Sequence, residues 1–483
     1  MPIRRNPERG AGRSAVESAT RAMRSLAEAE PAVFWLDDRS APPPLPCLVG
    51  EVEADVVVVG GGYTGLWTAL QAKESDPGCD VVLVEAGTVG HAASGRNGGF
   101  CAASLTHGEA NGLARFPDEF RTLERLGREN LDDIGDTIAR HRIDAEFERT
   151  GELDVAVEAW HVAELSDLAR ALAEQGSAAI VLDREQTQAL VHSPTYLACR
   201  YDPDGVALVH PAKLAWGLKR ACLDLGVRIY EHSEVTQIEK AGAGLRLRSA
   251  FGSIRGRRVA LATNAYTTLL RRLDHFVVPV YDYALVTEPL TPDQLASVGW
   301  SGRQGVADLG NQFHYYRLTA DNRILWGGYD VIYHYGNRIR PEHDQRLASS
   351  LTLAEHFFAT FPQLDGLRFT HRWGGVIDTC SRFTTFWGRA YGGRLAYALG
   401  YTGLGVGSSR FAARVMLDLL DDQDNERTRL RMVRSKPVPF PPEPLRYAAI
   451  QLTRWSIDRA DRHGGTRNPW LRTLDRFGLG FES

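Results

Sequence analysis

The sequence predicts an α/β fold, in which a Rossmann-like dinucleotide-binding domain is interleaved with a second domain built on a mainly antiparallel β-sheet with helices. Three observations predict it. Residues 55–65 read DVVVVGGGYTG, which is typical of a strand, a glycine turn and a helix. A second apolar run, DVVLVEA, carries Glu85. Residues 275–370 form a strand-rich stretch in which aromatic and polar residues alternate. It separates two segments that are each expected to belong to the dinucleotide-binding domain.

The glycine turn opens the first domain. A buried strand over 56–59 leads to three glycines and then to the apolar run LWTALQA. Gly60 is expected to make the tight turn, Gly62 to let the backbone approach a pyrophosphate, and Gly65 to let helix and strand pack closely. Glu85 is placed to accept hydrogen bonds from ribose hydroxyls. The alternative is a glycine-rich turn in another kind of parallel sheet.

The next segment favours FAD over NAD as the dinucleotide. Residues 90–99 read GHAASGRNGG, a polar, glycine-dense loop directly after the acidic strand. The glycines Gly95, Gly98 and Gly99 would let the backbone approach an isoalloxazine ring. Polar side chains offer donors to pyrophosphate or flavin oxygens: Ser94, Arg96 and Asn97. An ordinary loop with a solvated arginine is the alternative.

The later elements alternate between two expected domains. Helices are expected over 111–142, 159–175 and 211–226, and strands over 151–157, 244–250 and 257–263. The dinucleotide-binding domain is expected to comprise residues 51–110, 205–274 and 371–421, and the second, substrate domain residues 111–204 and 275–370. Residues 1–50 are expected to form an N-terminal tail and linker. Residues 422–483 form a C-terminal extension, interpreted as a surface tail or a contact for a partner.

Composition is that of an ordinary enzyme. Of 483 residues, 43% are hydrophobic and 24% are charged, and 56 basic residues face 60 acidic ones. This balance gives no reason to expect nucleic acid or an anionic membrane as partner. No apolar run reaches the ~18 residues of a membrane span, and no apolar stretch follows Arg4 and Arg5 as in a signal peptide. Six cysteines without a CxxC pair favour a cytoplasmic location and no metal site.

The chain resembles a family of flavoproteins. The run ADVVVVGGGYTGLWTAL, the acidic strand and ASGRNGG are similar to the glycine oxidase and D-amino-acid oxidase superfamily. Within it, they are most similar to the branch of gamma-glutamylputrescine oxidases and aminophosphonate oxidoreductases. Similar segments extend over residues 34–420: FWLDD (34–38), VHPAKLAWGLKRACLDLGVRIYE (209–231), LATNAY (261–266) and GYTGLGVGSS (400–409).

The resemblance implies FAD as the cofactor and adds expected FAD-binding residues. These are Val235, Thr263, Asn264, Gly400, Gly403, Leu404 and Gly405. The last two glycines open a helix whose N-terminus could face the flavin and stabilise negative charge on the reduced ring. A simple strand-to-helix turn is the alternative reading of that segment.

The catalytic residues are not fixed by a motif, because flavin chemistry needs little acid–base machinery. An aromatic pocket with one or two polar anchors is expected. Its candidates are Tyr281, Tyr283, Tyr316 and Arg317, with His314, Tyr315 and Trp326 beside them and Arg372 in reserve. Arg317 is the best anchor for an anionic group, since a guanidinium binds a carboxylate in bidentate fashion. Ordinary sheet packing for the tyrosines, and a surface or core ion pair for Arg317, are the alternatives.

The flavin is expected to be bound non-covalently. Some members of the superfamily link FAD through a histidine or a cysteine, and His91 and Cys380 are the residues to weigh. Neither lies in a convincing linkage pattern. The segment HAASG has one extra residue before the glycine, and the branch usually has glycine, not histidine, beside Ala-Ser-Gly. The residues around Cys380 do not match the pattern of a cysteinyl link. His210, before Pro211, is interpreted as a structural residue at a helix start.

The function that follows is oxidation of the C–N bond of a small amine or amino acid. Hydride transfer to flavin N5 would give an imine that hydrolyses, with oxygen or an electron carrier as oxidant. Two alternatives stay open. One is an FAD-dependent dehydrogenase of a hydroxy acid or polyol phosphate on the same scaffold. The other is a non-catalytic flavin-binding subunit of a larger complex, which the C-terminal extension would dock.

Overall fold

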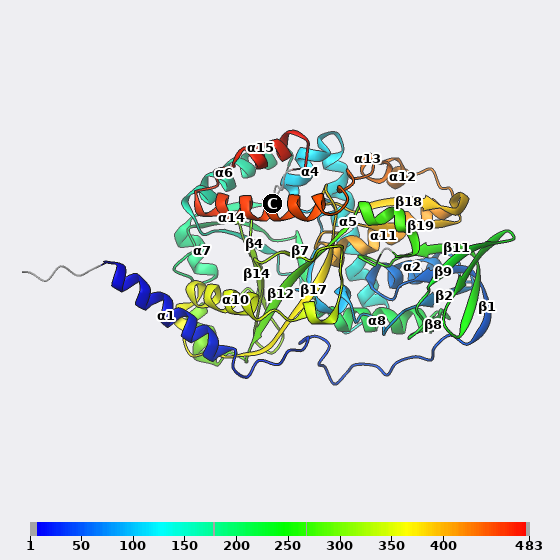
Figure 1. Cartoon of the computed structure of the whole chain (residues 1–483). Helices are drawn as coiled ribbons and strands as arrows, with labels where there is room; N and C mark the ends of the chain where they lie inside the picture. Colours follow the sequence, from blue (N-terminus) through cyan, green and yellow to red (C-terminus); the bar gives the residue numbers. More distant parts are fainter. Residues whose placement is uncertain (1–6, 177–178, 267, 480–483) are drawn as a thin grey trace, which may run out of the picture.

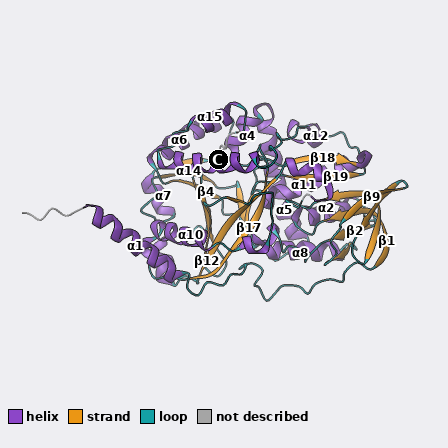
Figure 2. Ribbon diagram, viewed as in Figure 1, coloured by secondary structure: helices purple, strands orange, loops and turns teal. Residues whose placement is uncertain are grey.

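The computed structural model describes residues 7–176, 179–266 and 268–479 (Figure 1). Its strands gather in two groups, each surrounded by helices, one around β1, β2 and β9 and one around β4, β12 and β17 (Figure 2). The α/β class and the interleaving of two sheets are therefore confirmed. A third, two-stranded sheet, which shares no strand with the other two, pairs β3 (Phe100–Ala102) with β7 (Val206–Leu208).

The first sheet has the order β18-β19-β11-β1-β2-β8; the five strands from β19 to β8 run parallel, and β18 pairs antiparallel with β19. Its strands are β1 (Gly50–Val59), β2 (Val81–Val84), β8 (Arg228–Tyr230), β11 (Gly252–Leu261), β18 (Phe386–Ala390) and β19 (Leu395–Leu399). The antiparallel strands β9 (Gln237–Ala241) and β10 (Gly244–Arg248) extend β11. The unbroken valine runs of β1 and β2 form strands here because a parallel sheet is covered on both faces.

Helices cover one face of this sheet. Val56 and Val58 of β1 pack into a core with the helices, whereas Val57 and Val59 pack with β9, β10 and the residues before β12. The helices of this layer are α2 (Tyr63–Ser75), α5 (Phe120–Arg140), α8 (Pro211–Asp224) and α11 (Gly405–Leu420). The expected helix over 111–142 is divided, because Pro117 separates α4 (Glu109–Arg115) from α5.

The second sheet has the order β16-β12-β15-β14-β13-β4-β6-β5, with β17 on the other side of β12. Every pair except β13–β4 is antiparallel. Its strands are β4 (Glu152–Ala156), β5 (Ile180–Leu182), β6 (Ala198–Asp202), β12 (Val278–Thr287), β13 (Gly305–Asp308), β14 (His314–Leu318), β15 (Ile324–Gly328), β16 (Ile332–Tyr333) and β17 (Phe369–Thr379). Helices α6 (Ala159–Ala173), α7 (Arg184–Leu190), α9 (Pro292–Val298) and α10 (Leu347–Thr360) border it.

One strand lies in a different sheet from the one expected. Residues 369–379 pair with β12 in the second sheet, although the sequence placed 371–421 in the dinucleotide-binding domain. The ten-residue length of β12 explains the difference, because its free edge offers a full ladder of backbone groups to β17. The return to the first sheet begins only at β18.

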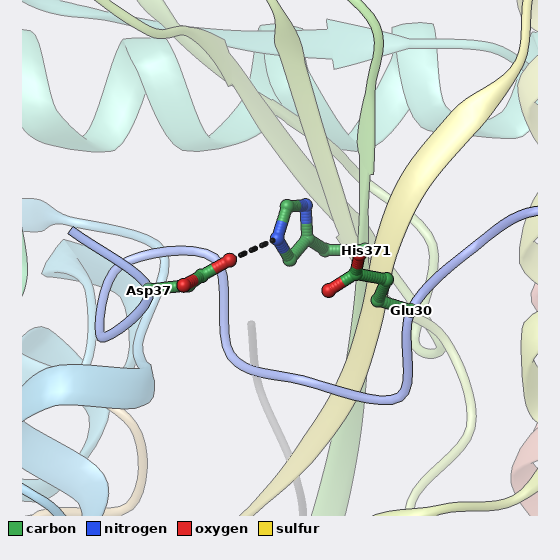
Figure 3. Close-up of side chains that lie close together, drawn as sticks. All are labelled: Glu30, Asp37 and His371. Atoms are coloured by element: carbon green, nitrogen blue, oxygen red, sulfur yellow. Dashed lines mark hydrogen bonds and ion pairs between the residues drawn. The ribbon is translucent and has the colours of Figure 1, made fainter. Parts of the chain in front are cut away.

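The N-terminal segment is fastened to the second sheet. After α1 (Pro7–Ser25), the Glu30 amide donates to the Thr370 carbonyl at 2.8 Å, and the Arg372 amide donates to the Glu30 carbonyl at 2.9 Å. Figure 3 shows Glu30, Asp37 and His371 gathered at this edge, with His371 Nε2 3.3 Å from Asp37 Oδ2. These contacts attach the segment to β17, on the outside of the cavity described below.

The C-terminal extension is mainly helical and packed against the rest of the molecule. Its helices are α12 (Glu426–Arg429), α13 (Arg431–Arg434), α14 (Leu445–Arg462) and α15 (Pro469–Arg476). In Figure 1, α14 and α15 lie at the top of the view beside α6 and α4. Among the helices of the described ranges, none has the length and apolar character that crossing a membrane requires.

Candidate active site

A large cavity lies where the two sheets meet. Its volume is about 940 Å³, near the upper end of the range for small-molecule sites. Its walls come from the glycine turn after β1, the loop over 90–98, strands β12 and β14, and the C-terminal extension. The cavity therefore joins the segments predicted to bind a dinucleotide to the sheet predicted to bind a substrate.

The three glycines of the turn have different surroundings. Gly60 has a φ of +110°, and a Cβ there would lie 2.4 Å from the Ala262 carbonyl oxygen. A Cβ at Gly65 would lie 1.8 Å from the Gly60 oxygen, so this glycine allows α2 to approach the turn. Gly62 lies on the cavity wall as the N-cap of α2, where a Cβ would meet only the Ser94 hydroxyl at 2.9 Å. The N-terminus of α2 thus opens on the cavity, ready for an anionic group.

Glu85 lies on the same wall and is almost buried, with 8% of its surface exposed. Its carboxylate accepts hydrogen bonds from the amides of Gly61 at 2.6 Å and Gly87 at 2.8 Å. A carboxylate has about four acceptor positions, so capacity remains for the hydroxyls of a ribose. Val235 and Glu234 line this same end of the cavity.

The loop over 90–99 is held by its own side chains. Helix α3 (Ala93–Arg96) gives one turn, and the Ser94 hydroxyl accepts a hydrogen bond from the Tyr63 amide at 2.9 Å. Arg96 donates to the His91 carbonyl at 2.9 Å and pairs with Asp344. The Asn97 side chain accepts from the Gly99 amide at 2.8 Å. Ser94, Arg96, Asn97 and Gly98 line the cavity.

Other predicted residues of this loop lie behind the wall. A Cβ at Gly95 would lie 2.3 Å from the Gly90 oxygen, and one at Gly99 would lie 2.3 Å from the Val209 oxygen. Both glycines therefore serve close packing of the loop and do not line the cavity. Two indoles donate hydrogen bonds to the loop: Trp35 to the Asn97 carbonyl at 2.8 Å, and Trp373, which itself lines the cavity, to the Arg96 carbonyl at 2.9 Å.

The segments near residues 263 and 403 also reach the cavity, as the prediction of a dinucleotide site requires. Thr263, Asn264, Gly403, Leu404 and Gly405 all line the cavity, and α11 begins at Gly405, so the N-termini of two helices open on the same space. Gly400 lies behind them, where a Cβ would be 2.9 Å from Cys380 Sγ.

Asp378 is a lining residue that the sequence analysis did not identify. It is 1% exposed, and its carboxylate accepts from the amides of Gly400 at 2.6 Å and Tyr401 at 3.1 Å. Burial raises the pKa of this carboxyl to about 7. A lone acid in the apolar run WGGVIDT was the available signal.

The two residues weighed for a covalent flavin lie differently. His91 lines the cavity, with 43% of its side chain exposed, and its Nδ1 lies 2.7 Å from the Thr88 carbonyl oxygen. Cys380 is completely buried and does not line the cavity. Its thiol donates to the Thr384 carbonyl at 3.2 Å, and burial raises the pKa of the thiol.

Strand alternation explains which aromatic candidates reach the cavity. Ala284, Gly327, Tyr315 and Ala307 lie opposite one another across four strands, so they share a face. Tyr315, Ala284 and Ala307 line the cavity, whereas residues on the other face, such as Tyr316, belong to the core of the second sheet. Four candidates belong to this core, Tyr281, Tyr283, Tyr316 and Trp326, and Tyr283 also borders the cavity.

The remaining candidates are also placed. The Tyr316 hydroxyl lies 2.6 Å from that of Tyr196, and His314 lies between Asp308 at 2.7 Å and His356 at 3.0 Å. Tyr283 borders the cavity and donates through its hydroxyl to the His343 carbonyl at 2.9 Å. Tyr315 lies on the cavity wall, and its ring centroid is 5.8 Å from that of Phe100.

Arg317 does not reach the cavity. It is 1% exposed and donates to the backbone carbonyls of Val209 at 2.7 Å and Leu318 at 3.1 Å. It shares the face of Tyr315, as strand alternation predicted, but it lies beneath Gly99, whose loop separates it from the cavity. The structure thus gives Arg317 a packing role in place of the expected anion anchor. Arg372, the reserve candidate, is outside the wall as well and donates to Gln345 at 2.8 Å.

Asp282 is a second unforeseen polar group on the substrate side. It lines the cavity, and its carboxylate accepts hydrogen bonds from the Tyr315 hydroxyl at 2.7 Å and from the Tyr283 amide at 2.8 Å. Burial raises the pKa of Asp282 to about 6. The acid inside the apolar strand VPVYDYALVT was the signal, since a buried carboxyl in a strand needs a reason.

The C-terminal extension also lines the cavity, which was not expected of a surface tail. Its lining residues come from the stretch before α14, from α14 and from α15: Val438, Pro439, Phe440, Pro441, Arg446, Ala449, Ile450, Thr453, Arg454, Ile457, Trp470, Leu471, Leu474 and Leu479. Phe440 and Ile450 pack with Val278 and Val280 of β12. We call residues 437–479 the C-terminal cover.

Comparison with known proteins adds sequence and fold relatives. Residues 55–419 match the family model described as DAO, FAD dependent oxidoreductase. The chain is 34% identical over 390 residues to gamma-glutamylputrescine oxidoreductase from Escherichia coli strain K12, covering 78% of this chain and 86% of that protein. Glycine oxidase from Geobacillus kaustophilus superposes with a TM-score of 0.63 at 19% identity, covering 78% of this chain and 96% of that one. L-proline dehydrogenase from P. horikoshii gives 0.63 at 17% identity, with 79% and 96% covered.

Proposed function

The chain belongs to the DAO family of FAD-dependent oxidoreductases, and from this premise we propose that it oxidises the C–N bond of a small amine or amino acid. One observation carries the proposal. One cavity is lined by most of the predicted FAD-binding residues and by the hydrogen-bonded pair Tyr315 and Asp282. The names of the relatives, an oxidoreductase of gamma-glutamylputrescine and an oxidase of glycine, agree with an amine as substrate.

The residues of the cofactor wall fit FAD. Glu85 has free acceptor capacity for ribose, Gly62 leaves room at the N-terminus of α2 for pyrophosphate, and the loop over 94–98 supplies polar contacts. The N-terminus of α11 offers partial positive charge to an electron-rich ring. Bound FAD would supply the hydride acceptor of the reaction.

On the substrate wall, Tyr315 and Asp282 are the proposed positioning groups. The Tyr315 hydroxyl donates a hydrogen bond to Asp282. The lone pairs on its oxygen are therefore free to accept a hydrogen bond from the N–H of a neutral amine. The apolar residues of the C-terminal cover and of β12 would exclude water from the reacting carbon. In this proposal, the protein orients and desolvates the amine.

Anaerobic reduction of the bound flavin tests the proposal. Purified protein should carry FAD, and amines or amino acids should bleach its visible absorption band in the absence of oxygen. Matched hydroxy acids and polyol phosphates should leave the band unchanged. Bleaching by a hydroxy acid alone would replace the proposal with a dehydrogenase of alcohols, and a flavin that no small molecule reduces would favour a non-catalytic subunit.

Replacing Glu85 by alanine is expected to weaken FAD binding by about 1–3 kcal/mol. The change removes the ribose acceptor and also leaves the buried amides of Gly61 and Gly87 without their partner. Equilibrium titration of the apoprotein with FAD measures the effect. Glu239→Ala is the control, because Glu239 lies on β9 and does not line the cavity. Equal affinities for the two variants would mean that Glu85 has been assigned the wrong role.

Acid precipitation is expected to release the flavin into the supernatant. The buried thiol of Cys380 lies outside the cavity and donates to a carbonyl, and the His91 ring is held by Thr88. The measurement is the visible spectrum of pellet and supernatant after denaturation in acid. A yellow pellet would contradict non-covalent binding, and the variants His91→Ala and Cys380→Ala would then identify the attachment.

A further inference from the structure

We propose that the C-terminal cover, residues 437–479, is the wall that selects the substrate, and that it selects amines whose group distal to the reacting carbon is apolar. This inference rests on the proposed amine oxidation. It goes beyond the family match, which covers residues 55–419 and ends before the cover begins.

Helix α14 has two distinct faces. Ile450, Thr453 and Ile457 follow one another at helical spacing and line the cavity. Leu445, Leu452 and Trp455 lie on the opposite side and are 64%, 41% and 56% exposed. The inner face is thus part of the site, whereas the outer face is not, although both carry large apolar side chains.

The C-terminal cover is attached to the loops of the second sheet at several points. The Asp461 carboxylate accepts hydrogen bonds from the amides of Asn311 at 3.2 Å and Gln312 at 3.1 Å. The Glu443 carboxylate accepts from the Gly336 amide at 2.9 Å, and Arg454 pairs with Asp330 at 3.1 Å. These contacts fix the position of α14, whose inner face forms part of the cavity wall.

The end of the cavity beneath the cover is mainly apolar. Two groups of apolar side chains line it. Phe313, Tyr329 and Val331 come from the loops of the second sheet, and Ile457, Leu471 and Leu474 come from the C-terminal cover. Trp470 donates to the Thr453 hydroxyl at 3.0 Å. Arg454 shares the Asp330 carboxylate with Arg346, and its buried Nε has no hydrogen-bond partner. An apolar group would gain from burial here, whereas a carboxylate would lose its hydration.

The first test uses substrate series on the full-length holoenzyme. For n-alkylamines, kcat/KM of anaerobic flavin reduction should rise by about fourfold for each added methylene until the space is filled. Amines of the same length that end in a carboxylate should be poorer by about tenfold or more. A preference for the carboxylated series would overturn the proposal and point to Arg454 as an anion anchor.

The second test fills the space from the cover. Ile457→Trp should lower kcat/KM for the longest accepted alkylamine by about tenfold or more, through KM, with little change for the shortest amine and in FAD content. Leu452→Trp, the same change on the outer face of α14, is the matched control and should behave as wild type. Equal length profiles for the two variants would overturn the proposal.

A readout without turnover separates this inference from the proposed function. Acrylamide quenching of flavin fluorescence should decrease in Ile457→Trp and be unchanged in Leu452→Trp, because only the inner residue lines the cavity. Ile457→Phe serves if the tryptophan variant does not fold. If no amine reduces the wild-type flavin, the proposed function fails. Unchanged quenching in both inner variants would show that the cover does not control access.

Discussion

Replacing Glu231 by alanine is expected to destabilise the protein by about 3–5 kcal/mol. The Glu231 side chain is completely buried, and both of its oxygens lie 3.0 Å from Nζ of Lys219, which is 3% exposed. The same carboxylate accepts from the amides of Val89, at 2.7 Å, and Leu45. The change would leave an ammonium and two amides buried without their partners, and chemical denaturation monitored by tryptophan fluorescence measures the loss.

Two further variants test the reason for this effect. Glu239 forms a partly exposed ion pair with Arg248 at 2.7 Å, so Glu239→Ala should cost no more than about 1 kcal/mol. Replacing the buried pair together, as Lys219→Met with Glu231→Leu, should recover part of the stability, because no uncompensated charge remains, although the amides of Val89 and Leu45 still lose their acceptor. If Glu231→Ala unfolds at the same denaturant concentration as Glu239→Ala, the buried pair is not the anchor that its contacts indicate.

Replacing Gly65 by alanine is expected to disrupt FAD binding and to cost about 3 kcal/mol of stability, the upper end of the usual range for overpacking. A Cβ at Gly65 would lie 1.8 Å from the Gly60 oxygen, and both groups belong to backbone that cannot move alone. Helix α2 must therefore shift away from the turn, and its N-terminus would leave the cavity wall. FAD titration and thermal unfolding of the apoprotein measure the two effects.

Gly135→Ala is the control for this experiment. Gly135 also lies within a helix, α5, but a Cβ there would meet Phe147 at 3.5 Å, an ordinary contact. Because alanine is the better helix former, this variant should be neutral or more stable by up to about 1 kcal/mol. Similar FAD affinities for the two variants would contradict the close approach at Gly65.

The cofactor wall was predictable because its signals are local. A short stretch of the chain contains Gly60, Gly62, Glu85 and the loop over 90–99. Each glycine is required by a turn or by the close approach of two neighbouring elements. The turn, the acidic strand and the loop accordingly meet at one cavity. Their contact with FAD itself stays a prediction.

The substrate wall was predictable only in part. Strand alternation correctly places Tyr315 and Arg317 on one face, but alternation does not say how far along the strand the cavity reaches. Arg317 lies past its edge, beneath Gly99. Pairing of β17 with β12 joins residues about 90 positions apart, and no local pattern specifies such a partner.

The C-terminal extension could not be placed from the sequence at all. Its charged and proline-rich composition reads as a surface segment, and the outer face of α14 is indeed exposed. The inner residues, such as Ile450 and Ile457, are apolar like the outer ones and differ only in the side of the helix on which they lie. Which side faces the molecule depends on what the helix packs against. Helical spacing predicts two faces but not which of them meets the molecule.

The order of strands in the first sheet has a consequence for biosynthesis on the ribosome. β1 lies between β2 and β11, and β11 lies beside β19, so neighbours in space come from residues 50–59, 252–261 and 395–399. A chain emerging from its N-terminus cannot complete this sheet until β19 has left the exit tunnel. The first sheet is therefore completed late in synthesis, and residues 437–479, which form part of the cavity wall, leave the ribosome after its last strand.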